Sequence, residues 1–295
     1  MAARTKRLIV VALTLVACGV GLASPALQQV GDRPVTRIVS LVPALTEVLF
    51  AIGAGPQVVG VSSFDEFPPD VKQLPRVGAL LDPDTERILA LDPDMVITYG
   101  SQGEVEAQFA RAGIEVFSYR HGGLQTVLDT MRALGRATGH AAEADAAARD
   151  IDTRLDAVRQ AVAGRGRPRT LLVFERQPLE LRQVYASGGV GFLHDILETA
   201  GGANVFADID SEATQPSVET ILVRAPDVVL EVRPNEAPDA DRQRGERAVW
   251  NVLGSIPAVR DDRVHFLYGD YLVVPGPRVV DVAEALARAL HPDAF

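Results

Sequence analysis

The stretch Glu86-Arg-Ile-Leu-Ala-Leu-Asp-Pro-Asp-Met-Val-Ile97 recurs later in the chain as Glu219-Thr-Ile-Leu-Val-Arg-Ala-Pro-Asp-Val-Val-Leu230. Each copy predicts a short helix, a Pro-Asp turn and a buried strand. Asp84 and Ser217 precede the two copies at equivalent positions and suit helix N-caps. The offset of 133 residues predicts two lobes built on one plan, with chance similarity as the alternative.

The chain around the two copies alternates between short β-rich runs and helical patterns. Strands are expected at residues 37–41, 95–98, 115–118 and 169–174, and helices at residues 43–52 and 105–112. This alternation is typical of an α/β protein with parallel sheets covered by helices on both faces.

A long helix is predicted between the two halves. Residues 141–163 contain no proline or glycine, and an apolar stripe at helical spacing runs from Ile151 to Val162. A helix of this length reaches about 34 Å at 1.5 Å per residue, roughly a domain diameter. We therefore expect an N-terminal lobe over residues 35–140, a linker helix over 141–164 and a C-terminal lobe over 168–295. A helix packed wholly within one lobe is the alternative.

The N-terminus has the layout of an export signal. Residues 1–17 begin with basic residues and continue into the apolar run Leu8–Val16, which is too short to span a bilayer. Cys18, the only cysteine, ends a Leu-Val-Ala-Cys sequence typical of bacterial lipoproteins, so we expect cleavage before it and acylation. Residues 18–34 would then be a tether. Ordinary cleavage near residues 23–26, leaving a free periplasmic protein, is the alternative.

Composition and motifs argue against several functions. The net charge of −10 is unfavourable for binding nucleic acid or an anionic membrane surface. No phosphate-binding loop and no nucleophile elbow occurs in the sequence. The five histidines are widely spaced and form no metal-ligand pair, although distant ones could still converge. We therefore expect neither an enzyme nor a resident metal or cofactor.

Several ordered motifs resemble those of one protein family. Residues 37–53, residues 59–69, the two glutamate repeats and Pro275-Gly-Pro-Arg278 are similar to the helical-backbone periplasmic binding proteins, and most of all to the cobalamin type. The similarity covers residues 35–292. It implies a class III periplasmic binding protein fold, with two Rossmann-like lobes joined by a single long α-helix. It also implies a substrate-binding protein that delivers a ligand to an ABC importer permease and its ATPase.

The resemblance gives the repeated glutamates a role. In the family, one exposed glutamate per lobe docks onto arginine pockets of the importer, and Glu86 and Glu219 occupy those positions. The alternative is that each glutamate only stabilises the N-terminus of its helix.

The resemblance also indicates ligand-binding residues. Ligand contacts of the cobalamin binders fall on Phe64, Tyr99, Tyr185, Asp270 and Tyr271. Aromatic faces suit a large flat macrocycle, so a corrinoid is the expected ligand. Ordinary packing is the alternative for each aromatic residue.

The chain departs from the cobalamin pattern at three places. Ala79-Leu80 and Ala213 stand where well-known cobalamin binders have tryptophan, and Val273-Val274 replaces a polar pair. These changes leave a ferric siderophore or haem as the second ligand class. Arg120 and Arg176 would then pair with its carboxylates, unless they are solvated surface residues. A surface sensor lipoprotein, or an enzyme on the same fold, is the alternative of another class.

Overall fold

The computed structural model of the protein describes residues 35–234 and 237–295. The predicted signal peptide, Cys18 and the tether up to residue 34 lie outside the described residues. None of the described helices is long and apolar enough to cross a membrane.

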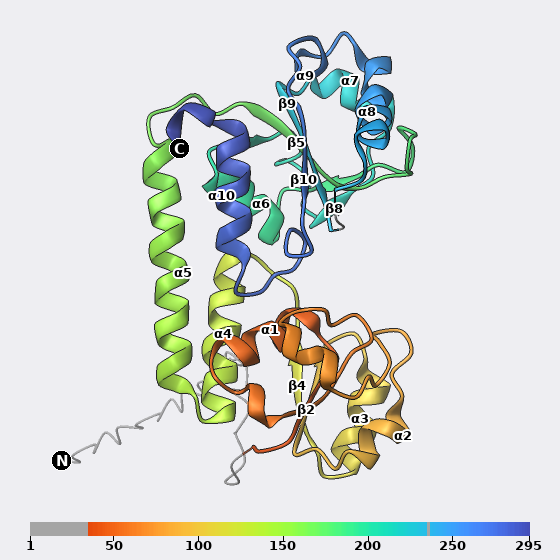
Figure 1. Cartoon of the computed structure of the whole chain (residues 1–295), viewed down its shortest axis with the longest axis vertical. Coiled ribbons are helices and arrows are strands. Elements are labelled where there is room, and N and C mark those ends of the chain that lie inside the picture. The colour runs from red at the N-terminus through yellow and green to blue at the C-terminus, as the bar shows by residue number, and fades with distance from the viewer. Residues whose placement is uncertain (1–34, 235–236) are drawn as a thin grey trace, which may run out of the picture. The chain divides into compact units, whose positions relative to one another are not determined.

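The N-terminal lobe is built on a four-stranded parallel sheet of order β2-β1-β3-β4 (Figure 1). Its strands are β1 (Ile38–Ser40), β2 (Val58–Val61), β3 (Met95–Tyr99) and β4 (Glu115–Tyr119). Its helices are α1 (Pro43–Ala51), η1 (Gly55–Gln57), η2 (Pro69–Gln73), α2 (Thr85–Ala90) and α3 (Gly103–Arg111). The central strand β1 is fully buried, as expected for a parallel strand covered on both faces.

The C-terminal lobe contains a six-stranded sheet of order β10-β9-β5-β6-β8, with β7 paired to β5. Its strands are β5 (Arg169–Glu175), β6 (Tyr185–Ser187), β7 (Ala203–Asn204), β8 (Ala213–Thr214), β9 (Val228–Arg233) and β10 (Val264–Tyr268). Its helices are α6 (Phe192–Thr199), α7 (Val218–Arg224), α8 (Ala240–Ala248), η3 (Val249–Leu253), α9 (Pro257–Arg260), α10 (Val279–Leu290) and η4 (Pro292–Ala294). Strands β6 and β8 are antiparallel to their neighbours, so the prediction of purely parallel sheets is wrong for this edge.

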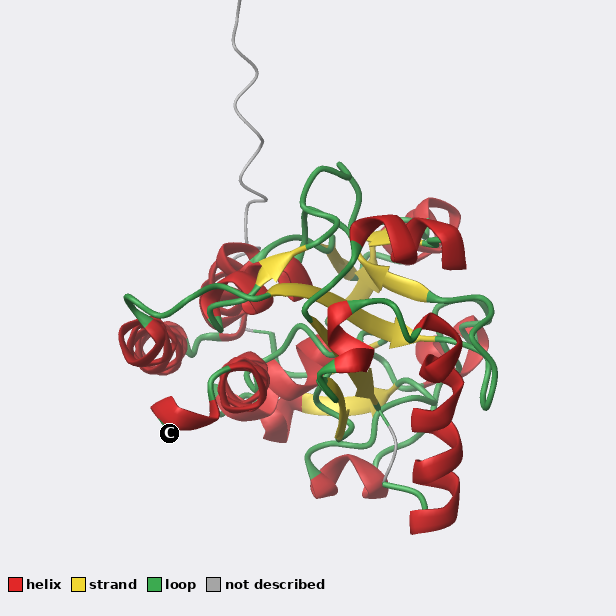
Figure 2. Ribbon diagram, turned by 90° about the horizontal axis from the view of Figure 1, so that it is seen from above, coloured by secondary structure: helices red, strands yellow, loops and turns green. Residues whose placement is uncertain are grey.

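The predicted linker helix is α5 (Ala141–Val162), which packs against α4 (Leu124–Thr138) and α10. The apolar stripe from Ile151 to Val162 is buried, as the spacing predicted. Figure 2 shows the strands in the interior with the helices around them.

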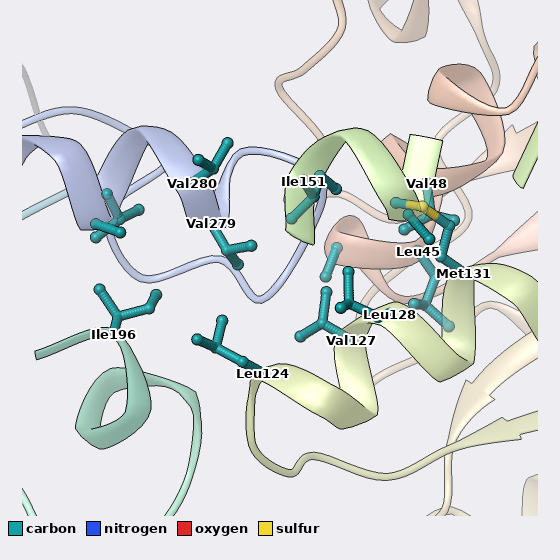
Figure 3. Close-up of a cluster of buried hydrophobic side chains, with 14 of the residues drawn as sticks. Leu45, Val48, Leu124, Val127, Leu128, Met131, Ile151, Ile196, Val279 and Val280 are labelled. Atoms are coloured by element: carbon teal, nitrogen blue, oxygen red, sulfur yellow. The ribbon is translucent and has the colours of Figure 1, made fainter. Parts of the chain in front are cut away.

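One hydrophobic core continues from the N-terminal lobe into the C-terminal lobe (Figure 3). Leu45 of α1, Leu128 of α4, Ile151 of α5 and Val279 of α10 belong to this one buried cluster. A polar contact adds to it, because the backbone N–H of Leu124 donates to Asp195 Oδ2 of α6 at 2.8 Å. Shared packing of this kind opposes large hinge motion between the lobes.

The internal repeat is confirmed in its local geometry. Asp84 accepts a hydrogen bond from the Arg87 N–H at 2.9 Å, and Ser217 accepts one from Thr220 N–H at 3.2 Å. Each side chain therefore satisfies a backbone donor that the helix itself leaves unpaired. The strands that follow, β3 and β9, are buried in their sheets.

Candidate ligand-binding site

Two tyrosines and a histidine meet where β3 and β4 end. The strands pair in register, so that Tyr99 lies opposite Tyr119, and their ring centroids are 6.0 Å apart. The imidazole of His121 lies 5.4 Å from the Tyr99 ring and 5.2 Å from the Tyr119 ring. Burial raises the pKa of both phenols, which therefore stay protonated and neutral at physiological pH.

Of this cluster, His121 lines a pocket of about 270 Å³ whose surface is mainly carbon, whereas Tyr99 and Tyr119 are not among its lining residues. His121 comes from the N-terminal lobe, and the other lining residues come from the C-terminal lobe: Phe174, Val190, Gly191, Phe192, Leu193, Glu212, Ala213, Val273 and Pro275. The volume is slightly below the roughly 300–1,000 Å³ of small-molecule sites. A macrocycle would therefore extend beyond this pocket or require the lobes to part.

The predicted residue Tyr185 lies beside the pocket wall and not among its lining residues. Its ring is 6.3 Å from that of Phe174, across the antiparallel pair β5 and β6. Sequence reasoning missed Phe174, Tyr119 and His121. Their position at strand ends, where open α/β sheets bind ligands, was the available signal.

The predicted residues Asp270 and Tyr271 surround the Arg278 guanidinium. Asp270 Oδ1 accepts from Arg278 Nη1 at 2.9 Å, and the guanidinium carbon lies 5.7 Å from the Tyr271 ring centroid. The same guanidinium lies 4.1 Å from the Phe67 ring and donates two hydrogen bonds to Glu47 of α1, at 2.6 and 2.9 Å. Burial raises the pKa of Glu47, and the Arg278 charge opposes this shift. Asp270 is therefore an ion-pair partner of Arg278 in a network that joins the two lobes.

The remaining predicted contact, Phe64, is 72% exposed on the loop after β2. Its neighbour Asp65 is buried instead, with only 1% of its surface exposed. Within the described chain, neither carboxylate oxygen of Asp65 makes a hydrogen bond of good geometry. Burial raises the pKa of Asp65, and the nearby Thr46 and Ser62 hydroxyls offset only part of this shift.

Replacing Asp65 with asparagine should raise the melting temperature at pH 7. The folded-state pKa lies above the ordinary value of 3.8, so the folded state binds this proton more tightly than the unfolded state. Stability therefore falls as the pH rises from 3.8 through the folded pKa, and at pH 7 the wild type bears the full cost. An unsatisfied buried charge costs about 1–3 kcal/mol or more.

Thermal unfolding between pH 4 and pH 7 would check this, with the exposed Asp70→Asn variant as control. The gain from Asp65→Asn should shrink toward pH 4. An Asp65→Asn protein that is less stable than wild type at pH 7 would show that the carboxylate is well solvated or paired.

The two predicted docking glutamates occupy matching places on the two lobes. Glu86 lies in the first turn of α2 and Glu219 in the first turn of α7, and both are exposed. The Ser217 hydroxyl lowers the pKa of Glu219, which keeps that side chain ionised. Leu89 and Leu222 also occupy equivalent positions, and each is 38% exposed.

Both sequence interpretations of Arg176 are wrong. Its side chain is completely buried and pairs with Glu231 Oε1 at 2.9 Å and with Glu246 Oε2 at 2.8 Å. It is therefore neither a surface residue nor free to bind an anionic ligand. Arg120 is exposed on the segment after β4. Among the residues described, no group of three or more His, Cys, Asp or Glu could hold a metal ion.

Known proteins share this sequence and architecture. The family described as periplasmic binding protein matches residues 38–271. The vitamin B12-binding protein of Salmonella typhimurium is 31% identical over 256 residues, which cover 86% of this chain and 90% of that protein.

Two solved structures extend the likeness to the fold. The periplasmic vitamin B12 binding protein of Vibrio cholerae has a TM-score of 0.74 at 26% identity, with 88% of this chain and 98% of that chain covered. A periplasmic haem-binding protein from Pseudomonas aeruginosa has a TM-score of 0.75 at 27% identity, with 88% and 94% covered. The predicted class III fold, with two Rossmann-like lobes and a long connecting helix, is confirmed.

Proposed function

Because this chain belongs to the periplasmic binding protein family, we propose that it captures a corrinoid of the cobalamin type and delivers it to an ABC importer permease. The family consists of carriers, so the chain is a binding protein and not an enzyme, as the sequence predicted. The proposal depends chiefly on one observation, the aromatic cluster at the ends of β3 and β4 beside a pocket lined mainly by carbon. Aromatic faces and apolar walls suit a large, flat macrocycle.

A ferric siderophore or haem is the second candidate, and similarity to a solved haem-binding protein favours it. The charges of the pocket favour the corrinoid. Among the described residues that line the pocket there is no arginine or lysine, and Glu212 is the only acidic residue. Carboxylate groups of an anionic chelate would lack a cationic partner there.

Isothermal titration with cyanocobalamin should show binding to the wild type and weaker binding to a Tyr99→Ala/Tyr185→Ala double variant. Truncated aromatics lose contact area and leave cavities, so we expect at least a tenfold rise in Kd, about 1.4 kcal/mol. Tyr268→Ala is a matched control, because Tyr268 stacks on Phe266, which does not line the pocket, whereas Tyr99 and Tyr185 each have a ring contact with a residue that does, His121 and Phe174.

A thermal-shift screen with cyanocobalamin, haem and ferric siderophores would test the ligand class independently. A folded wild type that ignores cyanocobalamin and is stabilised by haem or a ferric chelate would rule out the corrinoid. The importer role would survive that result.

The family assignment supports an exported, periplasmic location and a permease with its ATPase as partners. We further propose that Cys18 is acylated and anchors the chain through residues 18–34. The intact mass of the mature protein would test this, and an unmodified N-terminus near residues 23–26 would contradict it.

A further inference from the structure

Helix α4 of the N-terminal lobe begins without a cap from its own sequence. Gly123 occupies the N-cap position and has no side chain that accepts a hydrogen bond. The Leu124 N–H donates instead to Asp195 Oδ2 at 2.8 Å, and Asp195 lies in the first turn of α6 in the C-terminal lobe. A carboxylate at this place also interacts favourably with the positive end of the α4 dipole. The first turn of α4 is therefore capped by the other lobe.

Gly123 is required for this contact by space and not by backbone conformation. Its φ of −77° and ψ of −177° are an extended conformation that any residue adopts. A Cβ atom added to Gly123 would overlap with Asp195 Oδ2, and the nearest atoms that it would meet all belong to the Asp195 carboxylate. The close approach of the two lobes at this point therefore depends on the absence of a side chain.

The bond between the lobes lies next to two walls of the pocket. His121, two residues before Gly123, lines the pocket from the N-terminal lobe, and residues 191–193 line it from the start of α6. Leu124 and Ile196, which adjoin the bonded groups in the chain, belong to the same buried cluster (Figure 3). The position of one wall relative to the other is therefore fixed close to this bond.

We propose that Asp195 is a positioning residue for ligand binding, because its bond to the N-terminus of α4 holds the two pocket walls in place before the ligand arrives. This inference rests on the proposed function in requiring a ligand between the lobes. Without the bond the walls would move relative to one another, and binding would have to restore their arrangement at a cost in affinity. A ligand that extends beyond the pocket would still rest on both walls.

Two variants separate this role from simple helix capping. Asp195→Ala removes both the cap of α4 and the link between the lobes. Asp195→Ala/Gly123→Ser removes the link but supplies a local cap, because serine is a preferred N-cap residue and the backbone at position 123 is extended. Loss of the carboxylate also frees the space that the serine Cβ requires.

Titration with cyanocobalamin and thermal unfolding should therefore respond differently. We expect Kd to rise at least about fivefold in both variants, whereas the melting temperature should fall in Asp195→Ala and recover in Asp195→Ala/Gly123→Ser. Asp239→Ala is the matched control, since its carboxylate accepts from the Arg242 N–H at 2.9 Å as the N-cap of α8 within one lobe. This control should lose stability and keep its affinity. An affinity that recovers together with the melting temperature would overturn the positioning role and leave Asp195 as a helix cap.

A second measurement needs no ligand. In a Cys18→Ser chain, spin labels on Lys72→Cys of η2 and Arg244→Cys of α8, both exposed positions, would report the separation of the lobes. The distance distribution should broaden when Asp195→Ala/Gly123→Ser is added, and an unchanged distribution would overturn the proposal. If cyanocobalamin fails to bind the wild type and hemin binds, the corrinoid function is wrong, and the same rise in Kd is expected with hemin. If neither binds, the proposed function is wrong, and the label distances alone decide whether Asp195 holds the lobes.

Discussion

Replacing Arg176 with methionine should destabilise the protein by about 3–5 kcal/mol, the usual cost of removing one member of a buried ion pair. Arg176 and Glu231 have completely buried side chains, and Glu246 is 5% exposed. Arg233 contacts both glutamates at 2.6 and 3.4 Å, and the half-exposed Arg242 lies 3.9 Å from Glu246. Without Arg176, the two buried carboxylates would keep, among the described cations, only Arg233, shared between them, and the distant Arg242.

Some hydrogen bonds of this network would remain after the substitution and others would be lost. Trp250 Nε1 donates to Glu231 Oε1 at 2.5 Å, and the Leu179 N–H donates to Glu246 Oε2 at 3.3 Å. Arg176 itself donates to the carbonyl oxygens of Gln177 and Glu180. Replacing Arg176 should therefore remove both a positive charge and the hydrogen bonds that hold the loop between β5 and β6.

Chemical denaturation of wild type, Arg176→Met and Arg176→Met/Glu231→Gln would measure this effect. The double variant should regain part of the lost stability, because only one buried carboxylate then remains to be neutralised by Arg233. Arg182→Met is the matched control: its side chain is 76% exposed and its pair with Glu180 is 3.7 Å long, so the loss should stay below about 1 kcal/mol. An Arg176→Met protein within 1 kcal/mol of wild type would mean that the pocket around this arginine rearranges freely.

The sequence predicted the elements of this region but not the burial of Arg176. Hydrophobic runs and an internal repeat identify strands and helices, because both depend on neighbouring residues. The buried network joins residues 55 and 70 positions apart, which local periodicity does not report. One signal was present: Glu231 stands among the buried apolar residues of strand β9, and a buried acid requires a cationic partner.

The candidate site was likewise predictable only in part: its strands were predicted, but the long-range packing that forms its pocket was not. The expected strands 95–98 and 115–118 are confirmed as β3 and β4, and the pairing of Tyr99 with Tyr119 follows from their register. The antiparallel strands β6 and β8 were missed because they are three and two residues long, too short for a periodic pattern. Their placement brings Phe174 and Ala213 to one pocket, so the C-terminal wall of the site could not be predicted either.

Reversing both exposed glutamates, in a Glu86→Arg/Glu219→Arg variant, should reduce ligand import at least tenfold and leave ligand affinity unchanged. The repeat places one acid in the first turn of α2 and one in the first turn of α7, as a partner with two similar subunits would require. Truncating one member of an interface charge pair costs about 2–5 kcal/mol, and reversal adds repulsion. Neither glutamate lines the pocket, so binding itself should persist.

The fold should tolerate these changes, because an arginine in a first turn costs only about 0.3–1 kcal/mol against the helix dipole. Uptake of labelled ligand by vesicles that contain the importer, together with titration of the free protein, would separate docking from binding. Glu104→Arg/Glu143→Arg is the matched control, since these exposed acids lie in the first turns of α3 and α5, outside the repeat. Normal import by the Glu86→Arg/Glu219→Arg protein would remove the docking role and leave both glutamates as helix-stabilising residues only. Loss of import in the control pair as well would point to net charge, and not to two specific contacts, as the cause.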